Sequence, residues 1–185
     1  MPPSILSRDE LIQHLLAIFR KYGYEGATLS RISKATGLGK ASLYHHFPKG
    51  KESMAMAVLD YTSVWFSKYV FDVLNQEINP LKRLQKMTRN LSNFYSEGKD
   101  SCMIGVLVLS DADDIFHEHI KKSIKTWRLS IEKVLIESGL SKAIAKSRAE
   151  DAIIKIQGAL VVSRGLDHFS CFKRTMQQLP LELIR

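Results

Sequence analysis

The sequence of 185 residues predicts an all-α protein with an N-terminal helix-turn-helix part, residues 1–52, and a C-terminal helical part, residues 53–185. Three observations support this prediction. Apolar residues recur every three or four positions in most segments, which is the period of an amphipathic helix. Capping residues, glycines and prolines stand at the ends of these segments. The hydrophobic fraction of 45% is typical of a globular chain.

The N-terminal segments carry recognisable helix start signals. Ser7 and Glu10 form a capping-box pattern before an apolar repeat, and Gly23 is expected to end that first helix. The segment 28–47 then predicts two short helices. Thr28 is a good N-cap for the first of them, because its hydroxyl can accept a backbone N–H from the first turn.

The turn inside the segment 28–47 is marked by Gly37, which takes positive φ at no steric cost. Leu38 is expected to anchor the turn, while Leu43 and Phe47 are expected to bury one side of the second helix. This spacing is typical of a helix-turn-helix, whose second helix enters the major groove of DNA. The alternative is a generic three-helix bundle in which the same aromatic and apolar residues are only core.

Side chains on the opposite side of the second short helix are the candidate DNA contacts. Lysine can donate to phosphate or to guanine, and serine, tyrosine and histidine can reach base edges or the backbone. Helix starts add N–H groups that favour phosphate. The candidate DNA-binding residues are Thr28, Ser30, Lys40, Ser42, Tyr44, His45, His46 and Lys51.

Six further helical segments are predicted downstream, one of them with an alternative. The stretch Ser101–Leu109 could also be a buried strand, but the helical segments around it favour a short helix. Asn79 and Pro80 form a start signal, and Pro180 is expected to stop the last helix. The predicted segments are Lys51–Asn75, Pro80–Gly98, Ser101–Leu109, Asp111–Ser138, Ser141–Gly165 and Phe169–Leu179, the third being the ambiguous one.

Charge favours a polyanionic partner. The chain has 27 Lys or Arg against 19 Asp or Glu, a formal net charge of +8. Residues 1–55 alone carry eight Lys or Arg and four acids, so the basic excess is concentrated in the helix-turn-helix part.

The two cysteines, Cys102 and Cys171, form neither a disulfide framework nor a zinc-binding spacing, which favours a reducing cytoplasm. Buried thiols are the simple interpretation of both, with a redox role as the alternative. The first ten residues lack a signal-peptide pattern. The longest apolar run, Met103–Leu109, is too short to span a bilayer, so no membrane partner is expected.

No cofactor, metal ion or catalytic group is predicted. Asp113 and His117 stand one helical turn apart and would permit a metal site. Acids in the first turn of a helix are explained more simply by the helix dipole. The sequence contains no local motif of nucleophilic catalysis and no glycine-rich phosphate loop, so an enzyme is not expected.

The run GLGKASLYHHFPKGKESM, residues 37–54, resembles the N-terminal DNA-binding part of TetR/AcrR transcriptional regulators. The pattern leucine, tyrosine, any residue, histidine, phenylalanine is present, followed by a lysine–glutamate pair. Gly39 stands where the family often has serine, and the PKG connection is one residue longer, as in the LmrA/YxaF-like branch. The resemblance implies phosphate contacts at Thr28, Tyr44 and Lys51.

The segment Ser141–Gly165 is apolar on two sides and must therefore be buried on two sides. Burial within one subunit is one interpretation. The resemblance implies instead a four-helix dimer interface made by the last two helices of each subunit, which would suit a palindromic DNA site. The candidate interface residues are Ile154, Gly158, Val161, Gly165, Phe169, Phe172 and Met176.

The middle helices carry aromatic side chains that could line a cavity for a small molecule, although such stripes are more often plain core. The candidates are Trp65, Tyr69, Phe94, Tyr95, Met103, Trp127 and Gln157. The resemblance implies a homodimeric, cytoplasmic regulator of transcription, most simply a repressor that a hydrophobic effector releases from double-stranded operator DNA. The alternative is a small-molecule sensor that acts mainly through a protein partner.

Overall fold

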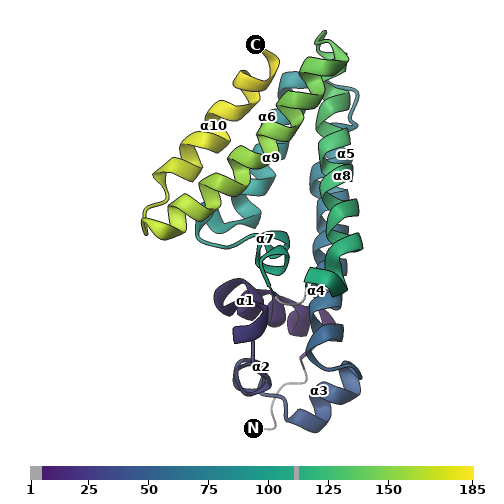
Figure 1. The fold of residues 1–185 in the computed structure, drawn as a ribbon, viewed down its shortest axis with the longest axis vertical. Coiled ribbons are helices and arrows are strands. Elements are labelled where there is room, and N and C mark those ends of the chain that lie inside the picture. Colours follow the sequence, from purple (N-terminus) through teal and green to yellow (C-terminus); the bar gives the residue numbers. More distant parts are fainter. Residues whose placement is uncertain (1–5, 111–112) are drawn as a thin grey trace. The chain divides into compact units, whose positions relative to one another are not determined.

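A computed structural model describes residues 6–110 and 113–185 (Figure 1). Every regular element among them is a helix, which confirms the predicted all-α class. No helix in these ranges is long and apolar enough to cross a membrane. The helices are α1 (Arg8–Gly26), α2 (Leu29–Thr36), α3 (Lys40–His46), α4 (Lys51–Phe66), η1 (Ser67–Phe71), α5 (Asp72–Leu74), α6 (Pro80–Phe94), η2 (Ser96–Gly98), α7 (Met103–Val108), α8 (Asp113–Glu137), α9 (Lys142–Gly165) and α10 (Ser170–Ile184).

The helices fall into two compact units. The first unit contains the described residues up to Ser63 and those of the range Met103–Glu118. The second contains Val64–Cys102 and His119–Arg185. This division differs from a boundary after residue 52, because α7 packs against α1 although some eighty residues separate them in the sequence.

In the first unit, α1 begins as its capping box predicts. The Ser7 hydroxyl accepts the Glu10 N–H, and the Glu10 carboxylate accepts the Ser7 N–H at 2.8 Å. These hydrogen bonds from Ser7 lower the pKa of the Glu10 carboxyl. Gly23 breaks the regular helix with a φ of 74°, as expected, but one more helical turn follows it to Gly26.

The second unit contains the part from Val64 onward of a long helical run that the sequence predicts as one helix, Lys51–Asn75. The run is continuous through α4, η1 and α5, but η1 is a π-helical turn. Such a turn inserts one extra residue and is rare. Its Tyr69 carbonyl accepts the side-chain N–H of Asn90 at 2.7 Å, so α6 satisfies one of the displaced backbone groups.

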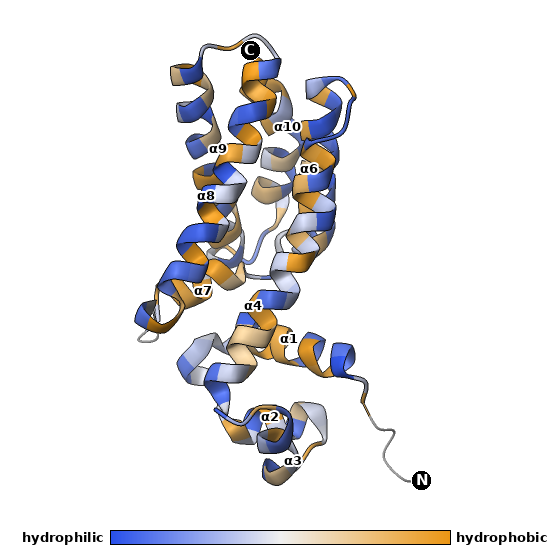
Figure 2. Cartoon of the chain, turned by 90° about the vertical axis from the view of Figure 1, so that its right-hand side faces the viewer, coloured by the Kyte–Doolittle hydropathy of each residue, from blue (hydrophilic) through white to orange (hydrophobic). Residues whose placement is uncertain are grey.

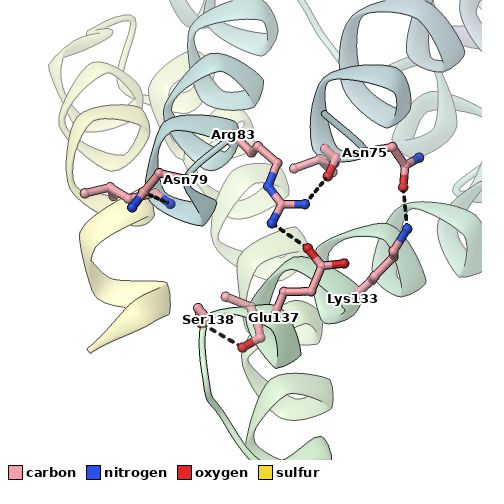
Figure 3. Close-up of polar contacts among 9 residues, drawn as sticks. Asn75, Asn79, Arg83, Lys133, Glu137 and Ser138 are labelled. Atoms are coloured by element: carbon pink, nitrogen blue, oxygen red, sulfur yellow. Dashed lines mark hydrogen bonds and ion pairs between the residues drawn. The ribbon is translucent and has the colours of Figure 1, made fainter. Parts of the chain in front are cut away.

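A polar cluster ties three helices of the second unit together (Figure 3). Arg83 of α6 is buried; it donates to the Leu74 carbonyl at the end of α5 and pairs with Glu137 of α8 at 2.5 Å. Lys133 of α8 donates to the Asn75 side chain at 3.0 Å. Because Arg83 is charged and buried, its two partners stabilise this one packing of α5, α6 and α8.

Helices α9 and α10 lie side by side, and α10 also packs on α6 (Figure 1). Apolar and polar residues alternate along both helices (Figure 2). The prediction that Pro180 stops the last helix is wrong, since α10 continues through it to Ile184. Leu179, Pro180 and Leu183 are all buried, and this packing offsets the hydrogen bond that proline cannot donate.

Candidate DNA-binding surface

The turn between α2 and α3 is fixed by local hydrogen bonds. Gly37 takes the left-handed conformation with a φ of 70°, as the sequence predicts. The Ser33 hydroxyl donates to the Leu38 carbonyl at 2.6 Å, and the Leu38 N–H donates to the Thr36 hydroxyl at 3.3 Å. Thr28 caps α2 by accepting the Arg31 N–H. These bonds set the angle at which α3 leaves α2.

Helix α3 has one buried side and one exposed side. Leu43 and the following Phe47 are almost completely buried, together with Ile32 of α2. This fixes the rotation of α3 about its axis. The side chains that α3 exposes are those the sequence singles out, namely Lys40, Ser42, Tyr44, His45 and His46.

The segment that contains α2 and α3 carries positive charge and no negative charge. From Gly26 to Lys51 the chain has five Lys or Arg and no Asp or Glu. Thr28 and Ser30 are also exposed, at the start of α2, where backbone N–H groups are available to an anion. Polar side chains, positive charge and helix starts therefore coincide on one part of the first unit, as a phosphate-binding surface requires.

Tyr44 and Lys51 are held by contacts within the first unit. Gly50 has a φ of 61°, and a Cβ there would lie 3.3 Å from the Tyr44 ring, so the ring rests on this glycine. The Lys51 ammonium lies 4.3 Å from the centre of the Tyr24 ring. Sequence reasoning missed Gly50 and Tyr24. The role of Gly50 could have been suspected from the glycine in the long PKG connection. The role of Tyr24 depends on contacts with residues distant in sequence and has no such signal.

Five of the predicted effector contacts form part of an aromatic cluster in the second unit. Trp65 stacks on Phe94 with 4.0 Å between ring centres and contacts Tyr69 at 5.1 Å. Phe66 joins Trp127 to the cluster at 5.3 Å, and Phe94 contacts Tyr95 at 5.1 Å. The Trp127 indole N–H is buried and has no hydrogen-bond partner among the described residues.

The other two predicted effector contacts, Met103 and Gln157, are not part of this aromatic cluster. Met103 belongs to the first unit, and Gln157 is half-buried on α9. A separate pocket of about 390 Å³ between α6 and α10 contains none of the predicted effector contacts. Among its lining residues are Thr88, Arg89, Lys173, Met176 and Gln177.

The predicted interface residues of α9 form an exposed strip opposite the core side of the helix. Ile154 and Val161 are 67% and 70% exposed, and Gly158 and Gly165 lie between and after them at helical spacing. Phe169 is half-buried. We name Ile154, Gly158, Val161 and Gly165 the α9 strip.

Two of the predicted interface residues require correction. Phe172 is fully buried and Met176 is 5% exposed, because α10 turns both into its own chain. The Phe172 ring contacts Tyr95 and covers Gly98, whose added Cβ would lie 2.9 Å from it. Both residues therefore stabilise the second unit and present almost no surface to a partner.

No group of three His, Cys, Asp or Glu side chains able to hold a metal ion lies together in the part of the chain that the structure describes. The alternative of a metal site at Asp113 and His117 is not described by the structure, because the Asp113 side chain lies outside the described part, as does Asp111.

The two cysteines have different surroundings. Cys102 is buried and accepts a hydrogen bond from the Tyr95 hydroxyl at 3.3 Å, whereas Cys171 is half-buried beside Ser163.

Comparison with known proteins identifies the family. Residues 11–58 match the family of bacterial regulatory proteins described as the tetR family. Residues 80–178, more than half of the chain, match the C-terminal domain of LmrA/YxaF-like transcriptional regulators. The chain belongs to the TetR family, in its LmrA/YxaF-like branch. It is therefore a DNA-binding transcriptional regulator and not an enzyme.

Individual TetR-family proteins agree with this assignment. The HTH-type transcriptional regulator LmrA of Bacillus subtilis is 26% identical over 161 residues, which cover 85% of this chain and 86% of LmrA. IcaR of Staphylococcus aureus, a negative regulator of a biofilm operon, is 33% identical over 47% of this chain and 38% of its own length. A TetR regulator from Legionella pneumophila has the same fold, with a TM-score of 0.80, 20% identity, and 97% and 98% of the two chains covered.

Proposed function

We propose that this regulator is a homodimeric repressor that binds a palindromic operator through α3 and leaves it when a small hydrophobic effector binds. The observation that carries the proposal is the exposed side of α3. Its Lys40, Ser42, Tyr44, His45 and His46 are polar and directed outward by buried Leu43 and Phe47. Lys40 is suited to guanine, and Tyr44 and Lys51 are suited to phosphate.

The α9 strip supports the homodimer. Two large apolar side chains of α9 that are about two-thirds exposed, Ile154 and Val161, lie beside two glycines that permit close approach of a second helix, and the equally exposed Leu166 follows directly after α9. A two-fold dimer carries two copies of α3, and two half-sites on one face of DNA lie about 34–36 Å apart. That arrangement explains why a palindromic operator is expected.

The aromatic cluster supports a site for the effector. Trp65, Tyr69 and Phe94 offer a partly accessible apolar surface, and the Trp127 N–H is a buried donor that a ligand acceptor would satisfy. The effector would act by binding more tightly to the form of the dimer that does not fit the operator.

Repression, as opposed to activation, is supported by the named role of IcaR as a negative regulator. Its place of action would be the cytoplasm, with the DNA. A repressor needs only to occupy its operator, which the helix-turn-helix and a dimer interface are sufficient to achieve.

The test is selection of bound sequences from random double-stranded DNA, followed by in vitro transcription from a promoter that carries the selected site. We expect an inverted repeat with half-sites one helical turn or a multiple of it apart, and a lower transcript yield with the protein present. Hydrophobic compounds are then screened for release. A selected site without two-fold symmetry would overturn the dimer, and a higher transcript yield would overturn repression.

A further inference from the structure

Tyr24 lies at the end of α1, directly after the break at Gly23, and its ring is held from two sides. The ring is nearly parallel to that of Phe19, 6.1 Å away, and is met edge-on by Phe116 at 5.6 Å. Phe19 and Phe116 are both fully buried. Their packing leaves the half-buried Tyr24 ring little freedom to move.

The remaining face of the Tyr24 ring receives a cation. The Lys51 ammonium lies 4.3 Å from the ring centre, well within the distance at which a cation is attracted to the face of an aromatic ring. Burial, and then the charges of Glu52 and Glu25, raise the pKa of the Tyr24 hydroxyl. The phenol therefore stays neutral, and the contact with Lys51 is one of cation with ring.

This contact matters because Lys51 is the first residue of α4. A lysine side chain loses about 2 kcal/mol of rotamer entropy when it is held in one conformation. The Tyr24 ring imposes part of that order before any DNA is bound. The ammonium has three N–H donors, so contact with the ring leaves donors for a phosphate at the α4 N-terminus.

We propose that Tyr24 is a positioning residue for DNA binding, which pre-orders the Lys51 ammonium for a backbone phosphate and is itself held in place by Phe116 of α8. The proposal rests on the phosphate contact of Lys51 in the proposed function. It assigns a role in DNA affinity to two residues that are remote from α3 in sequence. Phe116 belongs to the same helix, Asp113–Glu137, as Trp127.

The test is a double-mutant cycle on the full chain with its selected operator, read as the dissociation constant and its dependence on salt. Tyr24→Phe keeps the ring and is expected to bind like wild type. Tyr24→Leu is expected to raise the dissociation constant about two- to fivefold, the range of a partly exposed cation–π contact. In a Lys51→Gln background, Tyr24→Leu and Phe116→Leu should each have no further effect.

Tyr22→Leu is the matched control. Tyr22 is an exposed tyrosine of the same helix whose ring receives Arg31 at 4.5 Å and not Lys51. Its effect should simply add to that of Lys51→Gln. Circular dichroism checks that each variant keeps wild-type helicity.

The outcomes distinguish the phosphate contact of Lys51 from the positioning role of Tyr24. If Lys51→Gln changes neither affinity nor salt slope, the phosphate contact in the proposed function is wrong and the role of Tyr24 falls with it. If Lys51→Gln weakens binding but Tyr24→Leu is additive with it, only the role of Tyr24 is overturned.

If Tyr24→Leu does not fold, NMR of the wild type decides. The Lys51 ε-methylene protons should be shifted upfield by the Tyr24 ring current, both free and on DNA. Random-coil shifts for these protons in the DNA complex would refute the positioning role.

Discussion

Gly158→Trp is the substitution that tests the assembly of this regulator most directly. A Cβ at Gly158 has no neighbouring atom within 4 Å, so the protomer has space for a larger side chain at this position. Replacing a helical glycine with tryptophan also gains helix propensity, although less than the roughly 1 kcal/mol that separates glycine from alanine. The folded protomer should therefore tolerate the indole, and any loss must come from contacts between subunits.

The size of that loss follows from the exposed apolar residues on α9 around Gly158 and from Leu166, directly after α9. Ile154, Val161 and Leu166 are 67%, 70% and 67% exposed. If full burial of such a side chain contributes about 2 kcal/mol, covering the exposed part of three side chains in both subunits contributes about 8 kcal/mol. An indole between helices that pack at about 8–10 Å would remove at least half of this term. A loss of about 4 kcal/mol raises the dimer dissociation constant about a thousandfold.

Sedimentation velocity at micromolar concentration measures this effect. The wild type should sediment as a dimer and Gly158→Trp as a monomer with wild-type helicity by circular dichroism. Lys146→Trp, an exposed position of α9 outside the α9 strip, is the matched control and should remain dimeric. A dimeric Gly158→Trp variant, or a monomeric wild type, would refute the assignment of the α9 strip to the interface.

Three further predictions concern DNA and effector binding. Lys51→Ala should weaken binding to all DNA sequences alike and reduce the salt dependence of DNA affinity by about one ion. Lys40→Ala should instead relax sequence preference, as measured by binding to operators with single base changes. Equal behaviour of the two variants would contradict these roles. Gly50→Ala should lower the free energy of unfolding by about 1–2 kcal/mol and weaken operator binding, because its φ of 61° is strained for alanine and its Cβ would press on the Tyr44 ring. Gly39→Ser, at an N-cap with a φ of −69° and open space around it, should do neither in denaturant titrations and operator-binding assays, because serine caps a helix at least as well as glycine. Trp65→Ala should keep operator affinity but blunt release in an effector titration, and a loss of operator binding without effector would show that this ring is only core.

The helix-turn-helix could be predicted because its determinants are local. The Thr28 cap, the left-handed Gly37 and the buried Leu43 and Phe47 lie within twenty residues, and each acts on its near neighbours. Helix starts at Ser7, Asn79 and Ser141 followed from the same kind of signal, a side-chain oxygen that accepts a first-turn N–H.

The features that sequence reasoning missed depend on distant contacts. Pro180 is a helix stop by local rules, but α10 continues because its neighbours on α9 and α6 bury the residues around it. Phe172 and Met176 are apolar residues at helical spacing. Periodicity alone does not show whether their side of α10 packs inside the subunit, as Phe172 does against Tyr95, or against a partner subunit. The grouping of α7 with α1 likewise has no signal within either segment.

The π-helical turn η1 marks the place where the helical run from α4 to α5 holds one residue more than a regular α-helix would. One residue added to a regular α-helix would rotate everything after it by about 100°, and a π-helical turn absorbs that residue so that the faces before and after it stay aligned. Val73 and Leu74 follow η1 and are buried, so the turn keeps their side of the helix on the core. Deleting a single residue between Ser67 and Phe71 would remove the wider turn and leave a regular α-helix that still directs these side chains to the core and the Leu74 carbonyl to Arg83. We therefore expect a single deletion within η1 to be tolerated, whereas deletion of Lys82 in the regular helix α6 would turn the buried Leu84 and Met87 out of the core.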